Sequence, residues 1–295
     1  MNKTEIKNRI ANLNVYKRGG VRAPHKHLLL LYSIARLLQT GQRLVPYSEI
    51  DQNLRKLLIE FGPKRVNYHP QYSFWRLQED GLWEVDKPHK VALTSSGDAR
   101  RTDLITHNVS GGLPQDVFHH FISDKKFVSD VVFRILDTSF PSSIHEDILQ
   151  AVGLDIGNIS FKTKFRDPNF RNRIMQAYQY QCAVCGFNVR VGDTLVTLEA
   201  AHIQWYQADG PDQEDNGLAL CSLHHKLFDR GAFTVNNKMK IVVSEIVNGT
   251  QGFNDWVLAF HTKMISPPLR KTYYPKPKYL KWHENQVFKG RAREY

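Results

Sequence analysis

The chain is built around C-A-V-C at residues 182–185, L-E-A-A-H-I at 198–203 and D-N-G-L-A-L-C-S-L-H-H-K-L-F-D-R-G at 215–231. All three cysteines lie in these phrases, and two residues separate Cys182 from Cys185 and Cys221 from His224. Two such pairs supply four ligands to one tetrahedral Zn²⁺, and a site closed by four protein ligands is structural. The alternative is that the buried cysteines act as small hydrophobes. The sequence predicts structural zinc, because chance rarely gathers every cysteine into such pairs.

A second polar cluster is expected around His225, which directly follows the zinc ligand His224. If this segment is helical, adjacent side chains diverge by about 100°, so that His225 faces away from the zinc and toward His202. Asn216 lies between these two histidines in the sequence. A histidine can deprotonate water, and another can hold a divalent metal that neutralises charge on a phosphate. The asparagine can fix a loop by hydrogen bonding.

The order His202, Asn216, His225, flanked by the cysteine pairs, resembles an HNH endonuclease. The resemblance implies a ββα-metal fold, in which a hairpin carries the first histidine and a helix carries the last. It also implies that His202 is the general base and that Asn216 positions the hairpin loop and base. His225 would ligate a catalytic divalent ion, Mg²⁺, Mn²⁺ or another.

One position departs from the pattern of that family. Ala201 stands where many members carry an acidic metal ligand. Glu199 or Asp229 would serve instead, and the spacing does not choose between them.

The composition is that of a soluble, basic protein with two domains. A length of 295 residues is enough for two separate cores. The net charge is +11, with an excess of Lys and Arg in both halves. This charge indicates a polyanionic partner, most naturally nucleic acid, although generic solubility charge is the alternative. The sequence has no run of eighteen apolar residues and no signal-peptide core, and its zinc-type cysteines suit a reducing compartment, so a cytoplasmic protein is expected without a membrane contact.

The first half is predicted to be mainly helical. Helices are expected from Pro24 to the C-cap Gly41, from Ser48 to Phe61, and then over 114–122, 126–138 and 143–152. Residues 75–85 are expected to form a strand, a turn and a strand, and residues 108–114 a hinge. The linker to the second domain is placed at 153–163, and a helix capped by Asp167 opens that domain.

Two basic or aromatic segments of the first half are candidates for binding DNA. Arg22, His25 and Lys26 gather at the start of a helix, where the helix dipole disfavours cations and a bound anion would relieve the conflict. Residues 61–77 are basic and rich in aromatic rings; Phe74 and Trp75 are assigned to the core. The surface candidates in this segment are Tyr68, His69, Pro70, Tyr72 and Ser73.

The phrases P-H-K-x-L-L-L-L and Y-H-P-x-Y-x-F-W-R-L-Q-x-D-G-L-W resemble the sulfur-binding domain of phosphorothioate-dependent, McrA-like type IV restriction endonucleases. Those enzymes place an HNH nuclease after this domain. The implied partner is double-stranded DNA in which sulfur replaces a non-bridging phosphate oxygen. The resemblance implies that His25 and Lys26 contact the backbone, and that Tyr72 and Ser73 line the sulfur cup. Ser73 departs from the proline common there. Arg100 and its neighbour Arg101 would contact phosphate or base. In the second domain, Arg171 and Arg173 are separate candidates for contacts to phosphate.

The sequence therefore predicts an α+β protein, with a mainly helical DNA-reader domain at 1–153 and a zinc-stabilised ββα-metal (HNH) nuclease domain at 164–295. The predicted activity is phosphodiester hydrolysis near a phosphorothioate. Two alternatives stay open: an HNH enzyme that reads a methylated or otherwise modified base, and a non-catalytic protein that binds modified DNA. A homodimer would suit double-strand cutting, which needs two active sites or two visits.

Overall fold

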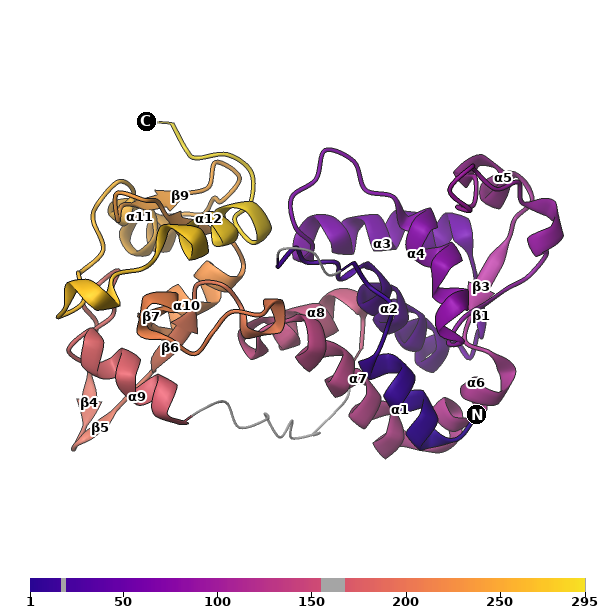
Figure 1. Ribbon diagram of the computed structural model, residues 1–295, viewed down its shortest axis with the longest axis horizontal. Helices are drawn as coiled ribbons and strands as arrows, with labels where there is room; N and C mark the ends of the chain where they lie inside the picture. The colour runs from indigo at the N-terminus through magenta and orange to yellow at the C-terminus, as the bar shows by residue number, and fades with distance from the viewer. Residues whose placement is uncertain (17–19, 155–167, 295) are drawn as a thin grey trace. The chain divides into compact units, whose positions relative to one another are not determined.

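The computed structural model describes residues 1–16, 20–154 and 168–294. The chain divides into two compact units (Figure 1). The described residues of unit 1 fall within Met1–Arg18, Arg22–Phe140 and His145–Phe161, and those of unit 2 within Gly19–Val21, Pro141–Ile144 and Lys162–Tyr295. The predicted domain limits stay predictions. Most of the predicted linker and the helix cap assigned to Asp167 lie outside the described residues.

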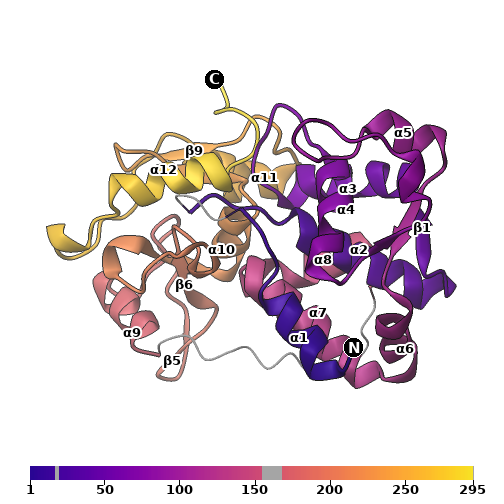
Figure 2. The ribbon, with the colours of Figure 1, turned by 45° about the vertical axis from the view of Figure 1, so that its right-hand side comes forward.

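Unit 1 is mainly helical, as predicted (Figures 1 and 2). Its centre is α2 (His25–Thr40), whose leucine-rich interior is buried and packs against α3, α4, α7 and α8. Gly41 ends α2 with a φ of 71°, a left-handed conformation that favours glycine, so the predicted C-cap is confirmed. The other helices are α1 (Lys3–Ala11), α3 (Tyr47–Phe61), α4 (Pro70–Arg76), α5 (Arg101–Thr106), α6 (Gln115–Ser123), α7 (Lys125–Ser139) and α8 (His145–Val152).

A small antiparallel sheet corrects two expectations for unit 1. Its order is β1 (Leu44–Pro46), β3 (Ser110–Gly112) and β2 (Glu84–Val85). The predicted hinge at 108–114 was wrong, because its glycines form the central strand. A Cβ on Gly111 would lie 2.7 Å from Phe74 Cε2 and from Trp83 Nε1, so this strand packs too closely for a side chain. The predicted strand at 75–77 was also wrong: α4 runs through Arg76, and Leu77–Asp80 is a 3₁₀ turn.

Unit 2 contains the hairpin-then-helix order predicted for the second half. Strands β6 (Leu198–His202) and β7 (Gly217–Cys221) pair antiparallel, with Leu198 opposite Cys221 and His202 opposite Gly217. Helix α10 (Ser222–Asp229) follows β7 directly. The remaining elements are α9 (Pro168–Ala177), the pair β4 (Arg190–Val191) and β5 (Thr194–Leu195), the hairpin of β8 (Phe233–Val235) and β9 (Ile241–Val243), α11 (Gln251–Trp256) and α12 (Pro277–Gln286).

One apolar core fixes the hairpin and α10 against α9. Phe170 and Ile174 of α9 are buried with Leu218 of β7 and Phe228 of α10. A Cβ on Gly217 would lie 2.3 Å from Ile174 Cδ1, so α9 rests directly on the strand backbone. His202 and His225 are therefore carried by elements that share one packed core. Within the described residues, no helix has both the length and the apolar character needed to cross a bilayer.

Candidate active site and metal sites

The four predicted zinc ligands converge in unit 2. The ligand atoms of Cys182, Cys185, Cys221 and His224 all lie within 4.8 Å of one another. Cys185 Sγ is 4.0 Å from Cys221 Sγ, close to the roughly 3.8 Å separation expected of two sulfurs on one tetrahedral Zn²⁺. His224 Nδ1 lies 3.1 Å from Cys221 Sγ and 3.7 Å from Cys182 Sγ. This donor set is compatible with structural zinc.

The surroundings of the cluster support the same interpretation. His224 Nε2 donates to the Trp256 carbonyl oxygen at 2.8 Å, which leaves Nδ1 facing the three sulfurs. A metal-binding histidine commonly donates its other ring nitrogen to such an acceptor. Hydrogen bonds from Cys185 and Cys221 lower the pKa of the Cys182 thiol, which favours the thiolate that zinc requires.

His225 lies between two carboxylates. Its Nδ1 is 2.6 Å from Glu199 Oε2, and its Nε2 is 3.1 Å from Asp229 Oδ2. Burial alone lowers the pKa of His225, but the charges and hydrogen bonds of Asp229 and Glu199 outweigh burial and raise it to about 9. The hydrogen bond from His225 is the main cause that lowers the pKa of Glu199. The pair of carboxylates therefore concentrates negative charge where a divalent cation would be stabilised.

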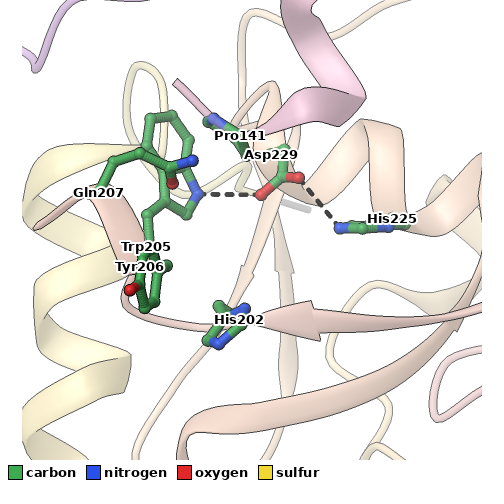
Figure 3. Close-up of a pocket in the computed structure, with 7 residues that line it drawn as sticks. All are labelled: Pro141, His202, Trp205, Tyr206, Gln207, His225 and Asp229. Atoms are coloured by element: carbon green, nitrogen blue, oxygen red, sulfur yellow. Dashed lines mark hydrogen bonds and ion pairs between the residues drawn. The ribbon is translucent and has the colours of Figure 1, made fainter. Parts of the chain in front are cut away.

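A small pocket joins His225 to His202, as Figure 3 shows. Asp229 lines this pocket, and its Oδ1 accepts a hydrogen bond of 2.9 Å from Trp205 Nε1. Glu199 does not line it; its Oε1 accepts instead from Ser222 Oγ at 2.6 Å. The remaining lining residues are Tyr206, Gln207 and Pro141, the last from the short segment that groups with unit 2.

His202 closes the pocket from the end of β6. Its ring is buried and stacks on Phe170, with centroids 4.2 Å apart and planes at 19°. Its Nε2 lies 2.7 Å from Asp212 Oδ1. Sequence reasoning missed Asp212, because four acidic residues lie between His202 and Asn216 and the sequence does not distinguish among them. The stacking and the carboxylate together fix the plane of the imidazole.

Asn216 organises the loop between β6 and β7. The residue is fully buried, and its Oδ1 accepts from the Gln204 backbone N–H at 2.9 Å. Its Nδ2 donates to the carbonyl oxygens of Gln204 and Pro211, each at 3.0 Å. These three contacts cross the loop that links the two strands. Asn216 therefore holds the backbone near His202 and does not line the pocket itself.

Two arginines of α9 predicted to touch phosphate hold the protein's own backbone. Arg173 Nη2 donates to the Asp212 carbonyl oxygen at 2.7 Å, and Arg173 Nε lies 3.1 Å from Glu214. Arg171 Nη2 donates to the Leu198 carbonyl oxygen at 3.0 Å. Both contacts tie α9 to the hairpin and its loop.

In unit 1, some predicted DNA contacts gather on the surface near the start of α2. Tyr72 is 39% exposed, and its ring stacks on His69 at a centroid distance of 5.0 Å. The Arg76 guanidinium lies 5.5 Å from the Tyr72 ring centroid. Burial, followed by the charges of Arg65 and His69, lowers the pKa of His25 to about 4. We call His25, Arg65, His69 and Tyr72 the reader cluster.

Three other predicted contacts are buried, and their roles in binding stay predictions. Lys26 Nζ forms a buried ion pair with Asp80 at 2.5 Å. Ser73 is buried, and its Oγ donates to the Pro70 carbonyl oxygen at 3.0 Å. The buried Arg22 donates to the Phe61 carbonyl oxygen at 2.6 Å.

The remaining predicted DNA contacts of unit 1 are partly buried and partly exposed. Pro70 is buried, and the Tyr68 hydroxyl donates to the Pro63 carbonyl oxygen at 3.2 Å. Arg100 and Arg101 are both exposed, and Arg101 also pairs with buried Asp51 at 2.7 Å. A contact of either arginine with DNA stays a prediction.

Two family models match separate stretches of the chain. Residues 3–156 match the family model described as "ScoMcrA-like, DNA sulfur-binding domain". The chain belongs to this family. Residues 182–236 match the HNH endonuclease model, so an HNH endonuclease domain follows the sulfur-binding domain. The order of domains and the enzyme class predicted from the sequence, an HNH-type endonuclease, are confirmed.

Several solved structures of the family resemble the chain at a distance. The sulfur-binding domain of ScoMcrA complexed with phosphorothioated DNA is 23% identical over 50% of this chain and 94% of that chain, with a TM-score of 0.44. The corresponding domain of SprMcrA is 18% identical over 53% and 98%, with a TM-score of 0.45. The ScoMcrA type IV phosphorothioation-dependent restriction endonuclease is 23% identical with a TM-score of 0.43, and the match spans 60% of this chain but only 40% of that one. No curated protein matches the sequence.

Proposed function

We propose that this protein is a modification-dependent endonuclease, which binds phosphorothioated double-stranded DNA through unit 1 and hydrolyses phosphodiester bonds nearby through unit 2. The observation that carries the proposal is the pocket lined by His202, His225 and Asp229 in a chain that belongs to a DNA sulfur-binding family. A base and a metal-binding pair at one pocket are what phosphodiester hydrolysis requires. A homodimer stays a prediction.

The reader cluster has the physical properties that a phosphorothioate requires. Sulfur is larger, more polarizable and more weakly hydrated than oxygen, so it favours the faces of aromatic rings over water. The stacked rings of His69 and Tyr72 offer such a surface. Arg65 supplies positive charge close to His25 for the flanking phosphates. The predicted cup would therefore be lined by Tyr72 and His69, with Ser73 beneath the surface.

The donor set of the pocket fits a catalytic divalent metal held by His225 and Asp229. Both residues line the pocket, and His225 Nε2 and Asp229 Oδ2 are adjacent. Glu199 would orient His225 from the opposite ring nitrogen, as carboxylates commonly do for metal-binding histidines. A bound divalent ion with two protein ligands would retain open positions for water and phosphate oxygens, and would stabilise the charge that develops on the phosphate. Ala201, which is fully buried, offers no ligand.

The residues around the pocket have separate roles in the proposed hydrolysis. His202 accepts a proton from the attacking water. The water oxygen then forms a bond to phosphorus, one P–O ester bond breaks, and the departing oxygen takes a proton from solvent. Asn216 keeps the loop backbone in place while this occurs, because its three hydrogen bonds span the loop. His225 and Asp229 would hold the divalent ion, which would supply the positive charge that stabilises the phosphate.

A binding titration with the His202→Ala protein tests the reader assignment without cleavage. One duplex is compared with and without a single phosphorothioate, at two salt concentrations. We expect a preference for the sulfur-containing duplex that persists at high salt, because the non-specific phosphate contacts weaken with salt and the apolar contact does not. Tyr72→Ala in the same background should reduce this preference and leave binding to unmodified DNA unchanged.

The same titration separates the alternatives. Equal affinity for both duplexes, falling together with salt, would contradict a sulfur reader; methylated duplexes would then be compared. Nicking assays with the unsubstituted protein and Mg²⁺ or Mn²⁺ test the nuclease directly. Absence of metal-dependent cleavage on every duplex would favour a non-catalytic DNA-binding protein.

A further inference from the structure

We infer that Asp212 is a positioning residue for His202, an inference that rests on the proposed role of His202 as the general base. The Asp212 carboxylate lies 2.7 Å from His202 Nε2, in a geometry that suits an N–H donor and a carboxylate acceptor. The His202 side chain is only 4% exposed, whereas that of Asp212 is 24% exposed. The carboxylate thus contacts the buried imidazole from a loop, and Asp212 does not itself line the pocket.

The loop that carries Asp212 is held from three sides. Its own carbonyl oxygen accepts from Arg173 Nη2 of α9 at 2.7 Å. The preceding residue, Pro211, accepts from Asn216 Nδ2 at 3.0 Å. Three positions further on, Asp215 pairs with Lys276 at 2.6 Å. Because these contacts do not involve the Asp212 carboxylate, they keep the backbone in place when only that carboxylate is changed.

The contact determines which nitrogen of His202 can act as the base. An N–H that donates to Asp212 places the ring proton on Nε2, so Nδ1 keeps the lone pair that accepts a proton from water. When Nδ1 takes that proton, the imidazolium that results lies against the Asp212 carboxylate, which stabilises it. The stack on Phe170 prevents the ring from rotating out of this arrangement. The other titratable groups that line the pocket are Tyr206, whose ring lies 6.5 Å from that of His202, and His225 and Asp229, which belong to the proposed metal-binding side.

The test removes the charge of the Asp212 side chain and keeps its size and shape. Asp212→Asn is compared with the unsubstituted protein in single-turnover cleavage at saturating DNA, with the dissociation constant for DNA measured in parallel. We expect the cleavage rate to fall by about 10- to 100-fold, the range for loss of a hydrogen bond to a charged group, with DNA affinity unchanged. The acid limb of the pH–rate profile should move to lower pH, because the base loses the charge that favours its protonated form.

Asp209→Asn is the matched control. Asp209 lies in the same loop, is exposed, and has a φ of 60°, a conformation that asparagine adopts readily. It undergoes the same change of charge without a contact to His202, so its rate and pH profile should equal those of the unsubstituted protein. Bound zinc is measured in every variant, because a merely structural defect would lower it.

A proton NMR spectrum supplies a readout that needs no cleavage. The His202 Nε2–H proton, bonded to a carboxylate, should give a downfield, slowly exchanging resonance that disappears in both His202→Ala and Asp212→Asn and persists in Asp209→Asn. Its absence from the unsubstituted protein, or a normal rate for Asp212→Asn, would overturn the inference. If His202→Ala itself cleaves normally, the proposed function fails instead; an inactive His202→Ala beside a fully active Asp212→Asn would overturn only the role of Asp212.

Discussion

Asp229 and Glu199 contact opposite nitrogens of the His225 imidazole, and the different tasks proposed for them rest on this arrangement. Asp229 Oδ2 faces Nε2 inside the pocket, whereas Glu199 contacts Nδ1 from outside it and also accepts from Ser222. The spacing of these acids in the sequence did not distinguish them. The pocket supports the proposal that Asp229 shares a bound ion with His225, because Asp229 lines it and Glu199 does not.

We expect Asp229→Asn and Glu199→Gln to weaken the catalytic metal to different degrees. Loss of a direct ligand should raise the Mn²⁺ concentration needed for half-maximal cleavage by more than about 100-fold, and loss of the carboxylate that orients His225 by about 10- to 100-fold. Metal titrations of single-turnover cleavage measure both. Equal effects, or a larger effect of Glu199→Gln, would contradict the assignment of Asp229 as the ligand.

Lys26 and Ser73 show how burial changes the role of a residue that matches a family phrase. Lys26 is neutralised by Asp80, and Ser73 caps the Pro70 carbonyl within α4. The rings of Tyr72 and its neighbour His69 stay exposed, whereas the Arg76 guanidinium beside them is paired with Asp98 at 2.5 Å. The surface that reads DNA is therefore expected to be more aromatic and less dependent on Lys26 than the sequence suggested.

At the scale of elements, the start of α2 carries a histidine that folding keeps neutral. The folded-state pKa of His25, about 4, lies below its ordinary value of 6.5, because of burial and then the charges of Arg65 and His69. Between these two pH values the unfolded chain binds more protons than the folded protein. The resulting stability is complete above about pH 6.5 and is lost as the pH falls toward 4.

We expect His25→Asn to remove this part of the pH dependence. The unsubstituted protein should lose about 2 kcal/mol more unfolding free energy than the variant between pH 6.5 and pH 4, a value reduced from the full shift because His25 is partly exposed. Urea unfolding followed by circular dichroism at several pH values measures the difference. Parallel curves for the two proteins would show that His25 titrates normally in the folded state.

Helix α12 presents a basic face next to the loop of the pocket. Lys278 and Lys281 are exposed, while Tyr279 and Trp282 of the same helix are buried. The residue just before the helix, Lys276, donates its backbone N–H to the Asp215 carbonyl oxygen at 3.0 Å, in addition to its ion pair with that side chain. This contact joins the basic helix to the loop that also carries Asp212. If unit 2 cleaves DNA as proposed, these lysines would meet the phosphates that flank the scissile bond.

We expect the double substitution Lys278→Ala, Lys281→Ala to weaken binding to modified and unmodified duplexes alike. Two lost phosphate contacts should reduce the slope of log K against log salt by about 2. Fluorescence anisotropy over a range of salt concentrations measures the slope. The control is Lys125→Ala, Lys126→Ala, which removes two exposed lysines from α7. A slope that falls equally in both proteins would mean that α12 has no special role.

At the scale of the whole molecule, each unit has its own source of stability. Unit 1 is built on the leucine-rich core around α2. In unit 2, the four predicted zinc ligands connect the segment of Cys182 and Cys185 to Cys221 and to His224 of α10. Structural zinc contributes about 10 to 16 kcal/mol in small zinc domains, because its ligands are not assembled in the unfolded chain. Metal removal should therefore act on one unit.

We expect a strong chelator, or Cys182→Ser, to unfold unit 2 and to leave unit 1 folded. Hydrogen exchange followed by mass spectrometry should show loss of protection across 168–294 and retained protection in α2 and α3. His225→Ala is the matched control, since it removes a histidine adjacent to the cluster but not a zinc ligand. Loss of protection in both units after chelation would contradict independent stabilisation.

Elements whose residues follow local helix and turn preferences were predicted correctly. Elements that depend on packing between distant segments were not. The left-handed Gly41 and the leucines of α2 follow local rules, so that helix was predicted nearly to its ends. Strand β3 was not predicted, because glycine in a sequence indicates a flexible segment. In the structure Gly111 is required by the close packing of Phe74 and Trp83 against it. In α4, the aromatic residues favoured a strand, and tertiary packing of that segment on α2 and α3 decided for a helix.

The sequence by itself determined the family, the order of reader and nuclease, the hairpin-then-helix motif, and the four residues that meet as a metal cluster. The metal cluster follows from spacing within short segments, where the period of a helix fixes which side chains share a face. The family, the domain order and the motif came from the resemblance of longer phrases to known families. The tertiary structure decided that Asp229 lines the pocket, that Asp212 contacts His202, and that Asp80 neutralises Lys26. These outcomes depend on which loops and helices pack together, and a contact between distant residues is set by the shape and burial of the elements that carry them.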